Sequence, residues 1–247
     1  MTSNTPEDPS LHLKAIAHNN HAAFLVEAGN YVDAISILSA AHKCSKYGLD
    51  QQCIRQSHLP VTAISPLDAA FMLVSAPAAK CCTSSSSDSD DTDCSSIHRG
   101  AIQLPPCLSS DYYSRVMVSV AIIFNLALAH HLSALEQAGS SKSVILFRKA
   151  LKFYEYSFNL VRTQHAKTSI SLLLMATINN AGHIHMMLGE EKHAETCFQN
   201  LFSILTCLPG GYCYHGHGGH RPALEVFFRT TSQYLVRVGP SCSAAAA

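Results

Sequence analysis

The stretch that decides the fold is NNHAAFLVEAGNYVDAISILSAA, which runs from Asn19 to Ala41. Apolar side chains recur at helical spacing on both sides of Gly29, a residue that ends helices and forms turns. Small residues stand at Ala22 before the glycine and at Ala34 after it. Small side chains on two antiparallel helices let their backbones approach closely. The stretch therefore predicts a helical hairpin.

An asparagine followed two residues later by alanine or glycine occurs at three places in apolar, helical stretches. The three copies are Asn20-His21-Ala22, Asn125-Leu126-Ala127 and Asn180-Ala181-Gly182. In the third copy Ala194 follows the small residue by twelve positions, as Ala34 does in the first. In the middle copy the loop 137–141 absorbs four extra residues before Ser143 and Phe147. We therefore expect three helical hairpins of similar construction.

These hairpins resemble the tetratricopeptide repeat family, whose second helix carries an alanine, an aromatic residue and another small residue. The matching positions are Gly29, Tyr31, Ala34 and Ala41; Leu126, Ala127, Phe147, Lys149, Ala150 and Leu151; and Gly182, Leu188, Gly189, Ala194 and Phe198. The copies depart from the family because they start 105 and 55 residues apart, against a period of about 34. The resemblance implies an all-α fold, with antiparallel helical hairpins stacked as a short α-solenoid. An unrelated helical bundle is the alternative.

The amino-acid composition of the rest of the chain indicates how it is organised into segments. The tract CCTSSSSDSDDTDCSS, from Cys81 to Ser96, has no large apolar side chain, so we expect it to be disordered. The expected organisation is a disordered N-terminus at 1–10, the first hairpin with an irregular segment at 11–80, a disordered Ser/Asp-rich insertion with a proline linker at 81–109, the second and third hairpins at 110–208, a Cys/His/Gly loop at 209–220, a capping helix at 221–239 and a tail at 240–247. Helices are predicted at 11–46, 67–74, 111–137, 142–162, 168–188, 190–207 and 222–238.

Charge and composition exclude several classes of partner. The 17 basic and 17 acidic side chains cancel, which argues against binding nucleic acid or anionic lipid. The stretches 116–135 and 168–189 carry no charged side chain, but their asparagines and histidines favour buried helices over membrane spans. The ten cysteines follow no disulfide framework and the N-terminus shows no secretory signal. We therefore expect a cytoplasmic or nuclear protein with reduced cysteines.

The resemblance implies a scaffold whose first helices line a concave face that binds a peptide or a partner helix. The residues expected to bind the partner are Asn19, Asn20, Asn125, His131, Asn179, Asn180, His183 and Met187. The amides of Asn20, Asn125 and Asn180 suit the main chain of a peptide, since each offers donors and an acceptor. The alternative is that these histidines and asparagines satisfy one another between helices.

Four potential metal ligands lie in one short loop, where imidazole and thiolate groups suit zinc, copper or nickel. They are Cys213, His215, His217 and His220. Their spacing is tighter than that of structural zinc sites, and a flexible glycine-rich loop is the alternative. The sequence lacks His-Glu-x-x-His, phosphate-loop and Gly-x-Ser-x-Gly motifs. We therefore expect no catalysis and no cofactor. A metal-handling protein or helical enzyme centred on this loop is the second interpretation, and self-association through the concave face is a third.

Overall fold

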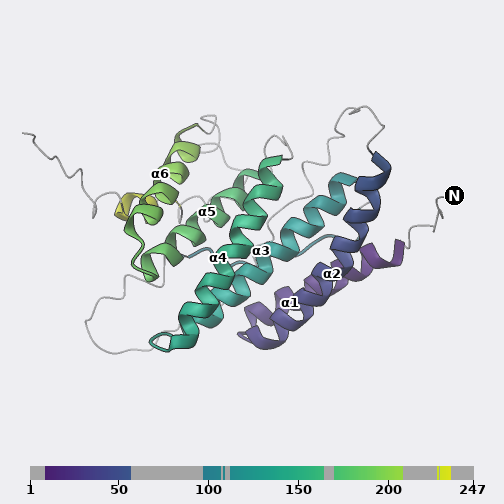
Figure 1. The fold of residues 1–247 in the computed structure, drawn as a ribbon, viewed down its shortest axis with the longest axis horizontal. Helices are drawn as coiled ribbons and strands as arrows, with labels where there is room; N and C mark the ends of the chain where they lie inside the picture. Colours follow the sequence, from purple (N-terminus) through teal and green to yellow (C-terminus); the bar gives the residue numbers. More distant parts are fainter. Residues whose placement is uncertain are drawn as a thin grey trace, which may run out of the picture. The chain divides into compact units, whose positions relative to one another are not determined.

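The computed structural model describes residues 9–56, 97–106, 108, 112–163, 170–207, 227 and 229–234. Within these ranges every regular element is a helix, and no strand occurs (Figure 1). The helices are α1 (Pro9–Glu27), α2 (Tyr31–Gln56), α3 (Tyr112–Glu136), α4 (Ser141–Thr163), α5 (Ile170–Met187) and α6 (Glu191–Cys207). The expected all-α fold class is confirmed.

The chain divides into two compact units. Among the described residues, the first unit holds α1 to α4 together with residues 99–106 and 108. The second unit holds α5 from residue 172 onward, α6, residues 97–98 and the helical residues at 227–234 that the structure describes.

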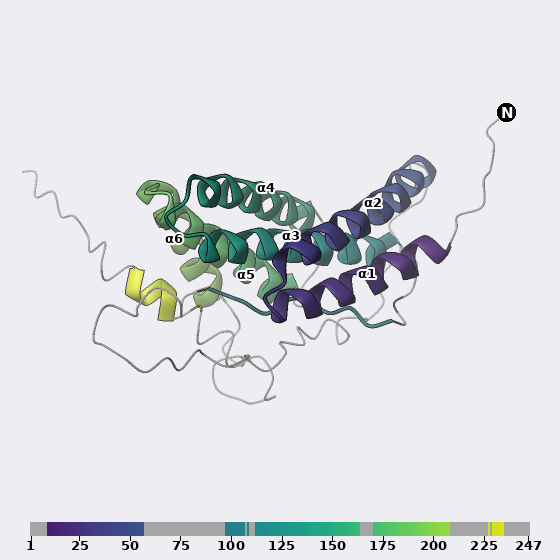
Figure 2. The same ribbon diagram turned by 90° about the horizontal axis from the view of Figure 1, so that it is seen from below.

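In the first unit, α3 is the central helix. It packs against α2 and α4 and also touches α1 (Figure 2). Residues 114–134 of α3 are all buried, because neighbouring elements cover the helix on every side. Among the described residues, Ser114–Glu136 is also the one helix long and apolar enough to cross a membrane by length and composition, and its apolar window lies wholly inside the protein. Burial inside the protein thus accounts for the apolar sequence of α3.

Two hairpin turns share one backbone pattern. Between α1 and α2, Gly29 has a φ of 80° and the N–H of Asn30 donates to the carbonyl of Leu25 at 2.8 Å. Between α5 and α6, Gly189 has a φ of 70° and the N–H of Glu190 donates to the carbonyl of His185 at 2.8 Å. A positive φ suits glycine, which closes a helix in this way without steric cost. The turn glycines therefore end α1 and α5 as expected from the sequence.

The small residues of the hairpins are buried. Ala22 and Ala34 have no exposed surface, and α1 and α2 pack together. A Cβ built on Gly182 would lie 2.9 Å from Cζ of Phe198 on α6. That distance is shorter than side chains tolerate, so α5 and α6 approach closely because residue 182 has no side chain.

Within the second unit, Tyr234, among the helical residues described at 227 and 229–234, covers part of α6. The ring of Tyr234 lies 4.5 Å from that of Phe198, and its hydroxyl donates to the carbonyl of Glu191 at 3.1 Å. These residues fall inside the predicted helix 222–238 and are helical where the structure describes them. We expected a helix capping a preceding helix pair, and these contacts place it on the last helix of that pair.

The structure differs from the sequence expectation at three boundaries. Helix α2 continues to Gln56, beyond the predicted end at residue 46, and α1 begins at Pro9, inside the N-terminus that we expected to be disordered. Residues 97–106 lie within the range assigned to insertion and linker, yet several of their side chains are buried. The predicted helix 67–74, the Ser/Asp tract at 81–96, the loop at 209–220 and the tail at 240–247 lie outside the described residues.

Candidate main-chain binding site

In the first unit, an asparagine of α1 holds the main chain of Leu104. Nδ2 of Asn20 donates to the Leu104 carbonyl at 2.7 Å, and the Leu104 N–H donates to Oδ1 of Asn20 at 2.8 Å. The side-chain amide thus satisfies both main-chain groups of one residue, as a neighbouring strand would. We call such a two-bond contact a main-chain clamp.

A second clamp in the same unit holds Ile102. The Ile102 N–H donates to Oδ1 of Asn125 at 2.7 Å, and Nδ2 of Asn125 donates to the Ile102 carbonyl at 2.8 Å. That carbonyl also accepts from Nδ2 of Asn19 at 2.9 Å. Nδ2 of Asn125 donates in addition to Oδ1 of Asn19 at 2.9 Å, so both asparagines are bonded through each end of their amides. Both are fully buried, where an unsatisfied amide would be costly.

The second unit contains a clamp of the same kind. The His98 N–H donates to Oδ1 of Asn180 at 2.9 Å, and Nδ2 of Asn180 donates to the His98 carbonyl at 2.9 Å. Asn179 donates to Oδ1 of Asn180 at 3.3 Å, just as Asn19 does to Oδ1 of Asn20 at 3.3 Å. The asparagine pairs of α1 and α5 therefore form matching contacts, each within its own unit.

The clamped residues belong to one continuous stretch, IHRGAIQL, at 97–104. It forms neither helix nor strand, and Figure 2 shows the part that belongs to the first unit, from residue 99 onward, as a coil beside α1. In an extended chain, main-chain groups that point the same way recur every second residue, which fits clamps on residues 102 and 104. The side chains of Ala101, Ile102 and Leu104 are buried. This resident segment therefore gains main-chain hydrogen bonds from asparagines and apolar contacts from its own side chains.

The clamps are neutral. Each combines an uncharged amide with an uncharged peptide group, so they distinguish an extended main chain by geometry and not by charge. A peptide group is present in every protein, and the bonds themselves carry no sequence information. Selectivity for one segment over another must come from the side chains beside the clamps.

The other residues expected to bind a partner have different surroundings. His131 is fully buried, with its ring 5.8 Å from that of Phe147 and 6.1 Å from that of Tyr154, edge-on to both. Its ring thus lies against two aromatic side chains of α4, and its expected contact with a partner stays a prediction. Helix α3 is covered on all sides, so its register does not expose one face. His183 is also buried, whereas Met187 is 40% exposed.

Sequence reasoning identified the asparagines but missed their occupant. The hydrogen bonds join residues 82 to 84 positions apart in three of the contacts, so no local pattern reveals them. The one available signal is the return of apolar side chains at Ile97, Ile102 and Leu104, between the Ser/Asp tract and Pro105. The proposed metal ligands Cys213, His215, His217 and His220 lie outside the described residues.

Comparison of the chain with protein-family models, with curated proteins and with solved structures finds no match. The likeness to tetratricopeptide repeats therefore stays a prediction from the sequence.

Proposed function

We propose that this protein is a non-catalytic interaction scaffold that binds an extended segment of a partner protein through its asparagine clamps. The supporting observation is that Asn20, Asn125 and Asn180 each bond both the N–H and the carbonyl of a single residue. Recognition of this kind gives affinity through the main chain and selectivity through side-chain contacts, as in other strand-binding proteins. The arrangement is also compatible with the concave face of a helical repeat protein.

The resident segment acts as a built-in competitor in this proposal. A partner peptide would replace Ile102 and Leu104 at the amides of Asn125 and Asn20, forming the same bonds. Because the resident segment is tethered, its effective concentration at the clamps is on the order of millimolar. The partner therefore binds weakly until the resident segment is released or outcompeted.

The partner is a protein or peptide with small or branched apolar side chains beside its clamped residues. The resident segment indicates this preference, since Ala101, Ile102 and Leu104 are each no more than 3% exposed. A charged side chain at these positions would lose its hydration without a counter-charge from the neutral amides.

The proposal is tested by releasing the resident segment and adding it back as a peptide. Ile102→Pro with Leu104→Pro removes the two N–H groups that donate to Asn125 and Asn20. Gln103→Pro is the matched control, because it lies between the clamped residues and extended chain accepts proline. The probe is a fluorescent synthetic peptide of residues 97–108 with serine in place of Cys107.

We expect the peptide to bind the double-proline protein at least about tenfold more tightly than the wild type or the Gln103→Pro control, because the tethered competitor is gone. Adding Asn125→Ala to the double-proline protein should abolish the binding. Circular dichroism checks that the helices persist, and Leu104→Pro alone serves if the double variant loses them. Equal peptide affinity for released and wild-type protein would refute the proposed function.

A further inference from the structure

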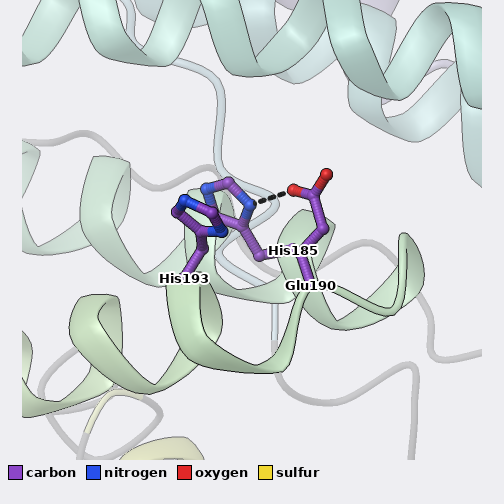
Figure 3. Close-up of side chains that lie close together, drawn as sticks. All are labelled: His185, Glu190 and His193. Carbon is purple, nitrogen blue, oxygen red and sulfur yellow. Dashed lines mark hydrogen bonds and ion pairs between the residues drawn. The ribbon is translucent and has the colours of Figure 1, made fainter.

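Three side chains with metal-ligand chemistry meet at the turn between α5 and α6. Figure 3 shows His185 at the end of α5, Glu190 in the turn and His193 in the first turn of α6. Nδ1 of His185 lies 2.7 Å from Oε2 of Glu190, and the two imidazole rings stack with centroids 5.1 Å apart. One ligand atom from each residue lies within 4.8 Å of the other two.

The backbone of the turn fixes these three residues relative to one another. The N–H of Glu190 donates to the carbonyl of His185 at 2.8 Å, and the N–H of His193 donates to the carbonyl of Glu190 at 3.0 Å. Gly189, with its positive φ, permits the reversal between them. The Cβ positions are therefore set by main-chain hydrogen bonds, and only the side-chain torsions are left to adjust.

The turn itself does not require this set of side chains. The α1–α2 turn has the same main-chain bond, from the N–H of Asn30 to the carbonyl of Leu25. The N–H of Ala34 donates to the carbonyl of Asn30 at 3.1 Å, just as the N–H of Ala194 does to the carbonyl of Glu190. At the α1–α2 turn the three equivalent positions hold Leu25, Asn30 and Asp33, and Nδ2 of Asn30 donates to Asp33 at 2.7 Å. The combination of two imidazoles and a carboxylate therefore occurs at the α5–α6 turn and not at the α1–α2 turn.

We propose that His185, Glu190 and His193 form a binding site for a divalent transition-metal ion, with Zn²⁺ as its representative. Two imidazole nitrogens and one carboxylate oxygen are a donor set that zinc and neighbouring metals accept. Bonds of about 2.0–2.2 Å around a tetrahedral ion hold its ligand atoms roughly 3.3–3.6 Å apart. Nδ1 of His185 and Oε2 of Glu190, 2.7 Å apart without metal, would separate slightly to admit the ion. His193 is exposed, so its ring is free to rotate toward the other two ligands.

The site remains open on one side. The side chains of His185 and Glu190 are 14% and 22% exposed, and three protein ligands leave at least one coordination position for water. The ion would replace the His185–Glu190 hydrogen bond and join the last turn of α5 to the first turn of α6. This site is separate from the asparagine clamps and does not depend on the proposed function.

The test is isothermal titration of Zn²⁺ into the full chain with Cys213, His215, His217 and His220 all changed to alanine, so that this loop contributes no ligand. We expect one Zn²⁺ per chain. His193→Ala should lower the affinity at least about tenfold, and His21→Ala, at an exposed position of α1, should leave it unchanged. Co²⁺ absorption spectra of the same proteins should show the loss of nitrogen coordination in His193→Ala.

Two results would overturn the metal site. One is absence of Zn²⁺ uptake by the loop-alanine protein while circular dichroism shows its helices intact. The other is uptake whose affinity neither His193→Ala nor His185→Ala alters. His193 is exposed and its replacement removes no buried side chain, so its effect reports on the metal and not on folding.

Discussion

Replacing Asn125 by alanine tests whether the clamps carry stability in the first unit. The substitution removes three hydrogen bonds, two to Ile102 and one to Asn19. The Ile102 carbonyl keeps its bond from Nδ2 of Asn19. Two buried groups therefore lose the partner that Asn125 provides: the Ile102 N–H and Oδ1 of Asn19.

The magnitude follows from these two groups. A buried polar group left unsatisfied costs about 1–3 kcal/mol, so Asn125→Ala should lower the free energy of unfolding by about 2–6 kcal/mol. Asn20→Ala also breaks a two-bond clamp, but Asn20 is part-buried and water can replace its bonds. At a net value of about 1 kcal/mol per hydrogen bond, it should cost roughly 2 kcal/mol.

Asn125→Asp separates hydrogen bonding from volume, because aspartate has nearly the same shape. An ionised aspartate cannot donate to Ile102 or Asn19, and it places negative charge beside both acceptors. At pH 7 it should destabilise at least as much as alanine. If lost volume were the cause of the alanine effect, aspartate would be mild.

The assay is urea unfolding followed by circular dichroism, combined with hydrogen exchange of the segment 97–104. We expect the Ile102 amide to exchange faster in Asn125→Ala than in wild type, and by a larger factor than the α4 amides, because it also loses its own hydrogen-bond acceptor. A loss of stability below about 1 kcal/mol, or an unchanged exchange rate at Ile102, would show that the clamp reasoning is wrong.

Three further outcomes are expected. Burial and the charge of Lys149 lower the pKa of His130 to about 4; since an unfolded chain has the ordinary value of about 6.5, its unfolded state takes up the proton first. The stability that neutral His130 contributes is therefore complete above about pH 6.5 and is lost as the pH falls toward 4. The loss should be about 1–2 kcal/mol after solvent screening. Urea titrations of wild type and His130→Phe at several pH values should show this difference. Gly182→Ala should destabilise by about 1 kcal/mol, because overpacking against Phe198 costs more than the gain in helix propensity, which thermal unfolding measures. Burial raises the pKa of the Cys197 thiol to about 11. At pH 7 this thiol should react with iodoacetamide about tenfold more slowly than a peptide thiol, because about 100-fold less thiolate is only partly offset by its greater nucleophilicity. Peptide mapping by mass spectrometry measures the rate.

Each of these three predictions has an outcome that would contradict it. Parallel pH profiles for wild type and His130→Phe would remove His130 as a source of acid sensitivity. A Gly182→Ala protein more stable than wild type would mean that Phe198 moves without cost. Alkylation of Cys197 at the rate of a free peptide thiol would show that its environment is more open than the folded chain indicates.

The hairpins could be predicted from sequence because their signals are local. Gly29 and Gly189 mark the turns, and the apolar spacing around them marks the helices. The segment that occupies the clamps could not be predicted from sequence, since its position depends on contacts between residues far apart in the chain. The direction in which His131 points could not be predicted for another reason. A helix buried on all sides has no polar face that indicates which side chains point to solvent.

The cluster at the α5–α6 turn was missed because its spacing belongs to no regular element. His185, Glu190 and His193 follow one another by five and three residues across a break between helices. Helical periodicity brings residues three or four apart together only within one helix. Here the glycine turn brings the end of one helix to the start of the next, and only the folded backbone shows it.

The complete burial of α3 has a consequence for how the protein is made. While the ribosome is still producing Ser141–Thr163, the apolar helix before it has α1, α2 and the resident segment to cover it, but not α4. A chain truncated before Ser141 would present the α4-facing side of that helix, including Phe124, whose ring lies 5.8 Å from that of Tyr154 in the finished fold. Such a fragment should aggregate or be held by chaperones, whereas the full chain shields this surface as soon as α4 leaves the ribosome.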